Sequence, residues 1–325
     1  MRVTENTNFG VVRDSISRTK GKMEDLQQKN ATLKKLNTPS DDPIGAAKVL
    51  EIRTDKVNND QFGMNSKMAE TFLDNSDHAL NEMSEIVVRA KEIAIGQSSG
   101  ASSNEDTRLG VAEEVTQLYN QAVAAANRRV GDRYLFGGYK TDRPPVDPDG
   151  KYLGDDGQMM IEISKDVFLP MNITGTEAFN THPQNANDTF ETNSQTRAPA
   201  STELGMMSGK TGPENVNLFD EVQNLRIALL TGDLDGIRDT LERFDQLHGK
   251  LVASRAKIGS RMQGLQSTGQ ALERHNITNA QLGSALEDAD MAQVVSDLAK
   301  EETVFRSSLQ TSQKLIQPTL LEFLK

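Results

Sequence analysis

Two adjacent aspartates followed by a proline, Asp41-Asp42-Pro43, are the side chains in this sequence that come nearest to forming a chemical site. Such a carboxylate pair could bind a hard cation, or serve as a general acid and base. Calcium takes about six to eight oxygen ligands, however, and no DxDxDG-like loop surrounds the pair. Aspartate is also a preferred helix N-cap, and proline is favoured at the first helical position. Because an apolar helical pattern begins at Ile44 and Ala47, a helix start is the favoured interpretation.

Other residues that could carry out chemistry are too scattered to form a site. The chain has no cysteine, which excludes thiolate nucleophiles and thiolate metal ligands. Its four histidines, His78, His182, His248 and His275, form no HExxH or HxxxH pair. His248 falls on an apolar helical stripe, which favours a packed side chain over a ligand. No P-loop, GxSxG or dinucleotide motif occurs. We therefore expect no catalytic, cofactor-binding or metal site, no cofactor, and a chain that is not an enzyme.

Charge and composition limit the partners of this chain. Its 325 residues carry a net charge of −11, which disfavours an electrostatic grip on nucleic acid or on an anionic membrane. No run of about 18 apolar residues is present, and the first residues lack the apolar core of a cleavable secretion signal. We therefore expect a protein with neither a nucleic-acid nor a membrane partner, and without a cleavable signal.

Apolar side chains three and four residues apart recur along most of the sequence, with the average period of 3.5 that is typical of coiled coils. This period predicts long helices packed side by side. Asn30 lies on the first stripe, where it could either fix the helix register or be locally solvated. The two terminal stripes and the apolar edge beside them supply the candidate coiled-coil and assembly positions, which are Val12, Ile16, Met23, Leu26, Leu33, Val295, Leu298, Phe305, Leu309, Ile316, Leu320 and Phe323.

Two zones in which the apolar pattern is weak interrupt these stripes, and we call them the joints. One is "NTPSDDP" at 37–43, where the helix cap would lie. The other is 275–290, after which the pattern restarts at Met291 one residue out of phase, so it predicts a register break or hinge. From about 140 to 215 the stripe is lost and Pro, Gly, Asn and Thr become frequent, which predicts short strands, turns and, over 181–214, a loop or irregular structure.

The expected fold is mainly α, a long antiparallel helical bundle or coiled coil formed by the N- and C-terminal regions, with a small β-rich insertion domain. The expected domains are a terminal coiled-coil assembly domain, a helical core domain with a β-hairpin and a β-containing insertion domain, over residues 1–40 plus 285–325, 41–140 plus 215–284, and 141–214 respectively.

Further segments carry a family resemblance, among them "NTPSDDPIGAAKVLEIRTD" at 37–55, "RLGVAEEVTQLYNQAVAAANRRVGDRYLFGGYKTDRPP" at 108–145 and the terminal run that begins "DADMAQVV". These segments resemble the bacterial flagellin family. Flagellin itself typically carries "SAKDDAAG" where this chain has "PSDDPIGA". That difference, together with "YLFGGY" followed by "PP", is similar to the members of the family that join the hook to the filament.

The resemblance implies an extracellular structural subunit at the hook–filament junction, exported through the flagellar type III channel without a cleavable signal. The partners it implies are the first flagellar hook-associated protein, flagellin, an export chaperone at the C-terminal region, and further copies of the chain in a ring or tube. A filament-forming flagellin is the alternative. A third possibility, an unrelated coiled-coil scaffold, is disfavoured by the matching joints near both ends.

Overall fold

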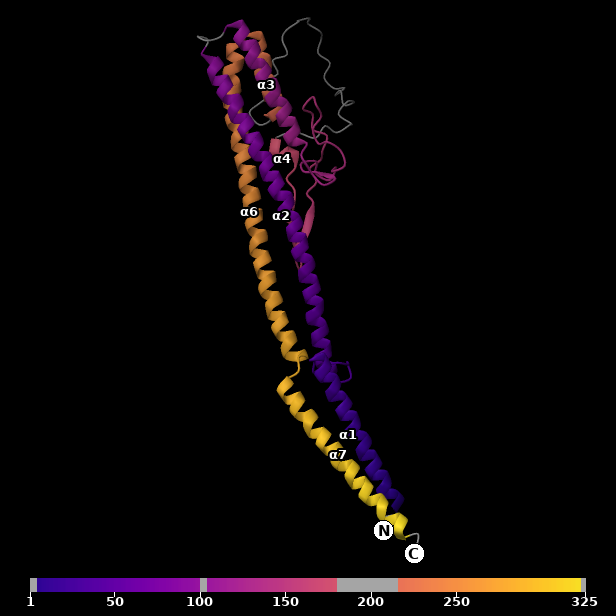
Figure 1. The fold of residues 1–325 in the computed structure, drawn as a ribbon. Helices are drawn as coiled ribbons and strands as arrows, with labels where there is room; N and C mark the ends of the chain where they lie inside the picture. The colour runs from indigo at the N-terminus through magenta and orange to yellow at the C-terminus, as the bar shows by residue number, and fades with distance from the viewer. Residues whose placement is uncertain (1–4, 100–103, 180–215, 323–325) are drawn as a thin grey trace. The chain divides into compact units, whose positions relative to one another are not determined.

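The computed structural model describes residues 5–99, 104–179 and 216–322, and long helices make up most of them (Figure 1). The predicted fold class is confirmed, because long antiparallel helices are accompanied by two small two-stranded sheets. The long helices are α1 (Glu5–Thr32), α2 (Pro43–Ser98), α3 (Glu105–Ala126), α5 (Leu218–Thr231), α6 (Leu234–Glu287) and α7 (Met291–Glu322).

Contacts within the chain define two compact units. The terminal unit comprises residues 1–60 and 272–325, and the central unit comprises residues 61–271, so that the division falls within α2 and α6. The three-part division expected from the sequence stays a prediction.

In the terminal unit, α1 and α7 lie side by side in antiparallel directions, with both chain ends at the same end of the pair (Figure 1). The stripes explain this pairing, since an amphipathic helix gains most of its stability by burying its apolar face against another element. Thr19 of α1 and Val294 of α7 are buried in the pair, and Lys22 approaches Glu301 at 3.8 Å.

The two predicted joints meet in this unit. After α1 ends, Leu33 adopts a left-handed backbone with φ of 60°, and its carbonyl accepts a hydrogen bond of 3.0 Å from the N–H of Ala289. The N–H of Lys35 donates to the carbonyl of Glu287 at 2.7 Å. Segments 33–35 and 287–289 thus form one isolated antiparallel bridge, which pairs these backbone groups where the helices are interrupted.

The predicted break over 275–290 was too wide, because α6 continues through Glu287 and only residues 288–290 separate it from α7. The polar residues that weaken the apolar stripe there face α2 and are paired. Nδ2 of Asn59 lies 2.9 Å from both Nδ1 of His275 and Oδ1 of Asn276, and the Asn276 amide donates to Asp60 at 3.2 Å. A polar layer between two helices therefore replaces the apolar contact that the stripe lacks.

The core of the described residues lies in the central unit, where α2, α3, α5 and α6 contribute its helices. Leu73, Leu80, Phe219 and Phe244 are among its fully buried side chains. Helix α5 had no separate stripe in the sequence. It begins at the N-cap Asn217, whose side chain accepts a hydrogen bond from Phe219, and it ends at a left-handed glycine.

A small β-containing region packs against this core, as the sequence predicted. Strands β1 (Arg129–Val130) and β2 (Arg133–Tyr134) form one antiparallel hairpin, and β3 (Met160–Ser164) and β4 (Val167–Pro170) form another, followed by the short helix α4 (Gly175–Phe179). The expected loop at 181–214 lies outside the residues that the structure describes.

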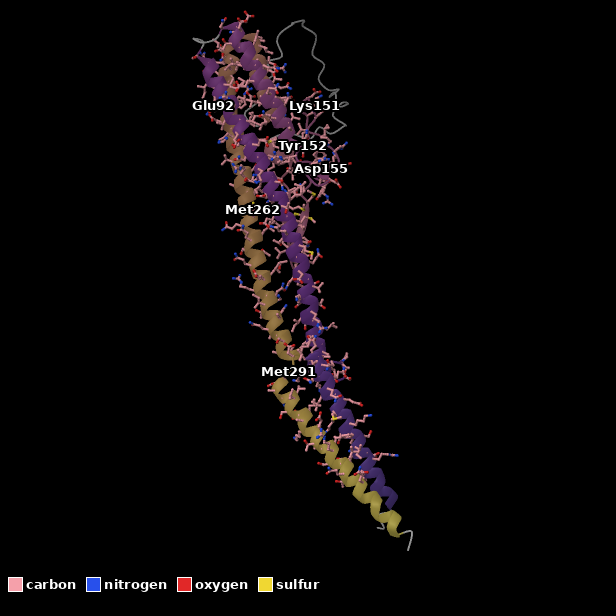
Figure 2. All side chains as sticks on the ribbon, in the orientation of Figure 1. Glu92, Lys151, Tyr152, Asp155, Met262 and Met291 are labelled. Atoms are coloured by element: carbon pink, nitrogen blue, oxygen red, sulfur yellow. The ribbon has the colours of Figure 1, made fainter. Side chains whose placement is uncertain are left out.

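Buried Tyr152 holds this β-containing region together (Figure 2). Its hydroxyl donates to the carbonyl of Phe136 at 2.6 Å and accepts from the N–H of Gly175 at 3.2 Å. Burial raises the pKa of this hydroxyl, because the anion would lose its hydration. The ring of Phe136 packs edge-on against that of Phe179, with 4.9 Å between the ring centroids. Phe136 therefore takes part in both the hydrogen bonds and the aromatic contacts that hold this region.

Candidate assembly interface

The aspartate pair lies at the start of α2, where both carboxylates bind backbone groups. Oδ1 of Asp42 accepts the N–H groups of Ile44 (3.1 Å) and Gly45 (3.0 Å), in the geometry of an N-cap one residue before Pro43. Asp41 accepts instead from the turn that precedes it. Within the described ranges, no group of three or more His, Asp or Glu side chains is placed to hold a metal ion.

Asp41 organises residues 37–41 into a compact turn. Its Oδ2 accepts the N–H groups of Thr38 (2.9 Å) and Asn37 (3.1 Å), and its Oδ1 accepts the Thr38 hydroxyl at 2.8 Å. These hydrogen bonds, first of all that from the Thr38 backbone, favour the charged carboxylate and lower the pKa of Asp41. The two aspartates therefore have different local roles, one in the turn and one at the helix start.

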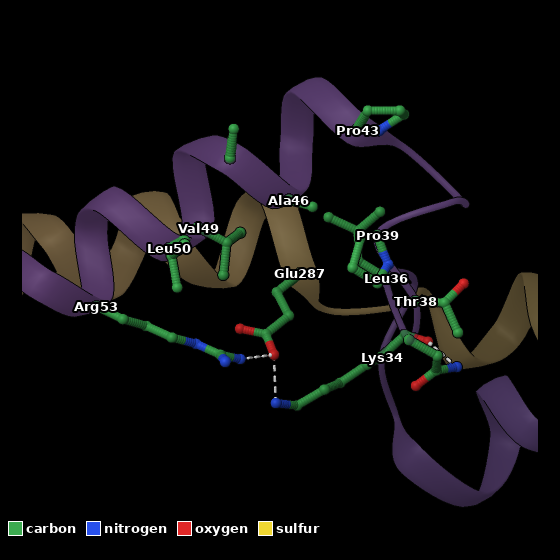
Figure 3. Close-up of a pocket in the computed structure, with 12 residues that line it drawn as sticks. Lys34, Leu36, Thr38, Pro39, Pro43, Ala46, Val49, Leu50, Arg53 and Glu287 are labelled. Carbon is green, nitrogen blue, oxygen red and sulfur yellow. Dashed lines mark hydrogen bonds and ion pairs between the residues drawn. The ribbon is translucent and has the colours of Figure 1, made fainter.

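A mostly buried carboxylate holds the joint from the other side. Glu287, at the end of α6, forms ion pairs with Lys34 and with Nη2 of Arg53, the latter at 2.5 Å (Figure 3). The Glu287 side chain is only 14% exposed, whereas those of Lys34 and Arg53 are 43% and 58% exposed. One carboxylate thus links the segment after α1 to α2 and α6.

Beside this carboxylate lies a groove of about 520 Å³, which we call the joint groove (Figure 3). Its walls combine apolar side chains with the three charged groups of the ion pairs. They are Lys34, Leu36, Asn37, Thr38, Pro39, Pro43, Ala46, Ala47, Val49, Leu50, Arg53 and Glu287.

The predicted assembly residues fall into three groups in the structure. Those that lie half-buried in the helix pair are Val12, Ile16, Met23, Leu26, Leu298 and Phe305. Those that stay exposed are Leu33 (54%), Val295 (51%) and Leu309 (41%). The side chains of Ile316, Leu320 and Phe323 lie outside the described part of the chain. The pair therefore covers one side of its apolar stripes and leaves an apolar edge open to water.

A second groove, the terminal groove, lies between α1 and α7 and has a volume of about 420 Å³. Most of its lining residues are small, and several are hydroxylic. They are Val11, Val12, Ser15, Thr303, Val304, Ser307, Ser308 and Thr311.

Sequence analysis missed one exposed apolar row on α2. Leu50 and Val57 are 66% and 68% exposed and lie one heptad apart, whereas Val49 and Asn59 are buried. The signal is present in the sequence, because Leu50 and Val57 are one heptad apart, but this spacing alone does not tell whether the face is buried or exposed.

The fold and these surfaces define a class of protein, built of long helices, in which the first and last helices pair with each other and leave apolar side chains exposed. No helix in the described ranges has the length and apolarity that crossing a bilayer requires. Residues 3–141 match the family described as the bacterial flagellin N-terminal helical region. The resemblance to the bacterial flagellin family is therefore confirmed.

Relatives that match nearly the whole chain show which members of the family this chain resembles. Flagellar hook-associated protein 3 of Salmonella typhimurium is 22% identical over 315 residues, which is 96% of each chain. Flagellin of Listeria monocytogenes is 24% identical over 324 residues, covering 98% of this chain and 99% of that protein. The crystal structure of the flagellar junction protein of Legionella pneumophila has the same fold, with a TM-score of 0.53, 19% identity, and coverage of 74% of this chain and 100% of that one. Neither curated relative bears the name of an enzyme.

Proposed function

We propose that this chain is a structural subunit of the bacterial flagellum that joins the hook to the filament and assembles through its terminal helices. The observation that carries the proposal is the match with a flagellar hook-associated protein 3 over 96% of both chains. In this role the chain is not an enzyme. It acts in motility from outside the cell, after export without a cleavable signal.

The terminal unit supplies a physical mechanism for assembly. Two helices paired along one stripe cannot bury all their apolar side chains, and Val295 and Leu309 remain exposed on α7. Burial of apolar area contributes about 25 cal/mol per Å², so further copies of the chain would stabilise this edge. Contacts between unlike surfaces of identical subunits build rings or open tubes.

The proposed neighbours follow from the position of such a junction. They are the first flagellar hook-associated protein on the cell side, flagellin on the distal side, and, before export, a chaperone at the C-terminal region. The alternative is a filament-forming flagellin. It is supported by the match to Listeria flagellin over 98% of this chain.

Deletion of the gene separates the two functions. If the chain is a junction subunit, we expect bare hooks and monomeric flagellin in the medium, because export continues but the filament has no site of attachment. A filament subunit predicts that no flagellin protein is found in cells or medium. Normal filaments, with no second copy of the gene present, would contradict both.

A substitution in α7 tests the proposed mode of assembly. Phe305 is half-buried in the helix pair, so Phe305→Asp places a charge on the apolar stripe. We expect it to leave the thermal transition of the central unit intact and to abolish incorporation into flagella. Gln310→Asp, at an exposed position of the same helix, is the matched control and should incorporate normally. Loss of the main thermal transition in Phe305→Asp would contradict this assignment.

A further inference from the structure

The exposed row on α2 is a helix face that the described residues leave largely open to solvent. Leu50 and Val57 are 66% and 68% exposed on α2, and Leu50 also forms part of the wall of the joint groove beside buried Val49. They lie seven positions apart, which corresponds to about 10 Å along a helix. Ala47 precedes Leu50 in the row and Thr54 lies between Leu50 and Val57, so the two large side chains alternate with small ones.

The terminal groove has dimensions that suit this row. On α7 it extends from Thr303 to Thr311, which is about 12 Å along the helix. Ser15 on α1 and Ser307 on α7 line it with short side chains, so that a third helix can approach closely. Helices pack by inserting ridges of side chains into grooves of this kind.

We propose that Leu50 and Val57 of one copy of this chain insert into the terminal groove of a second copy. This inference rests on the proposed function and names the surfaces that perform the assembly. A second copy is the fitting occupant because the row and the groove lie on the same unit, match in length, and are both open in the single chain. The two surfaces differ, so the contact is heterologous, and a pair of copies keeps one free row and one free groove to which further copies can add.

The absence of cysteine from the chain allows a direct test. One variant carries Leu50→Cys, and a second carries a cysteine substitution in the groove, made in turn at Ser15, Ser307 and Thr311. The two are produced together in cells that lack the natural copy. Hook–filament complexes are isolated, oxidised mildly and run on a denaturing gel without reductant. A disulfide requires Cα atoms about 4.4–6.8 Å apart, so it reports close contact.

We expect a cross-linked dimer of the two variants for at least one groove position, and none when either variant is present alone. Ile277→Cys, at a position of α6 that is 54% exposed, replaces Leu50→Cys in the control and should give no dimer with any groove position. A dimer from Leu50→Cys alone would overturn the proposal, because it would mean that like surfaces meet. Chain present in the complexes without any of the three cross-links would also overturn it.

Charge substitution gives an independent measurement. Leu50→Glu should reduce incorporation at least tenfold, since it places a carboxylate in the groove. Adding Ser307→Lys should restore incorporation, whereas adding Gln310→Lys should not. Equal effects of the two lysine substitutions would contradict the pairing. Failure of the unmodified chain to enter the complexes at all would contradict the proposed function instead.

Discussion

The joint offers a quantitative prediction, because one carboxylate serves two cations there. Glu287→Gln keeps the shape of the side chain and removes the charge that binds Lys34 and Arg53. The bridge between segments 33–35 and 287–289 should then open more often.

The stability that Glu287→Gln loses depends on how exposed the three charged side chains are. A hydrogen bond to a charged group contributes about 1.5–3 kcal/mol, and an ion pair at the surface about 0–1 kcal/mol. Glu287 is nearly buried but both cations are about half exposed, so we expect a loss of about 1–2 kcal/mol. This corresponds to roughly a 5- to 30-fold change in the opening equilibrium.

Native-state amide exchange measures that equilibrium at single residues. The N–H groups of Lys35 and Ala289 make the bridge hydrogen bonds, and both should exchange roughly 5- to 30-fold faster in Glu287→Gln. Glu70→Gln removes the partner of exposed Lys67 in the central unit and is the matched control, expected to leave both rates unchanged. Unchanged rates at Lys35 and Ala289 in Glu287→Gln would refute the reasoning.

Three further predictions concern the start of α2 and the insertion. Asp42→Ala removes the N-cap acceptor and should cost about 1 kcal/mol, seen as roughly fivefold faster exchange in the first turn of α2; unchanged rates would argue against it. Hydrogen bonds from Thr38 lower the pKa of Asp41 below 3.8, so they stabilise the turn fully above that pH and are lost as the pH falls through the lower, folded-state pKa; an NMR titration midpoint at or above 3.8 would contradict this. Tyr152→Phe removes the buried hydroxyl that contacts the Phe136 carbonyl and the Gly175 N–H, which remain hydrogen-bonded to each other, and should lower the free energy of unfolding in urea by about 0.5–1.5 kcal/mol; exposed Tyr139→Phe should lower it less, and equal losses would count against the buried network.

The long helices could be predicted from the sequence because their signal is local. Apolar positions three and four residues apart mark α1, α2, α6 and α7 whatever those helices contact. The same locality explains the error at 275–290. Asn276 and its neighbours weaken the stripe, and only the structure shows that Asn59 of α2 pairs with them.

The contact between the two joints could not be predicted, because it joins residues far apart in the chain. Lys34 and Glu287 are 253 positions apart, and neither lies in a motif. The exposed row of Leu50 and Val57 was missed for another reason. Helix α2 carries two apolar faces, and periodicity alone does not tell which of them a single chain buries.

The position of this chain in isolated flagella tests the central claim most directly. Gold-labelled antibody against the chain, viewed by electron microscopy, should mark a single narrow band between hook and filament, with no label along the filament. Label distributed along the whole filament would mean that the chain is the filament subunit, and flagella without label would contradict a structural role at the junction.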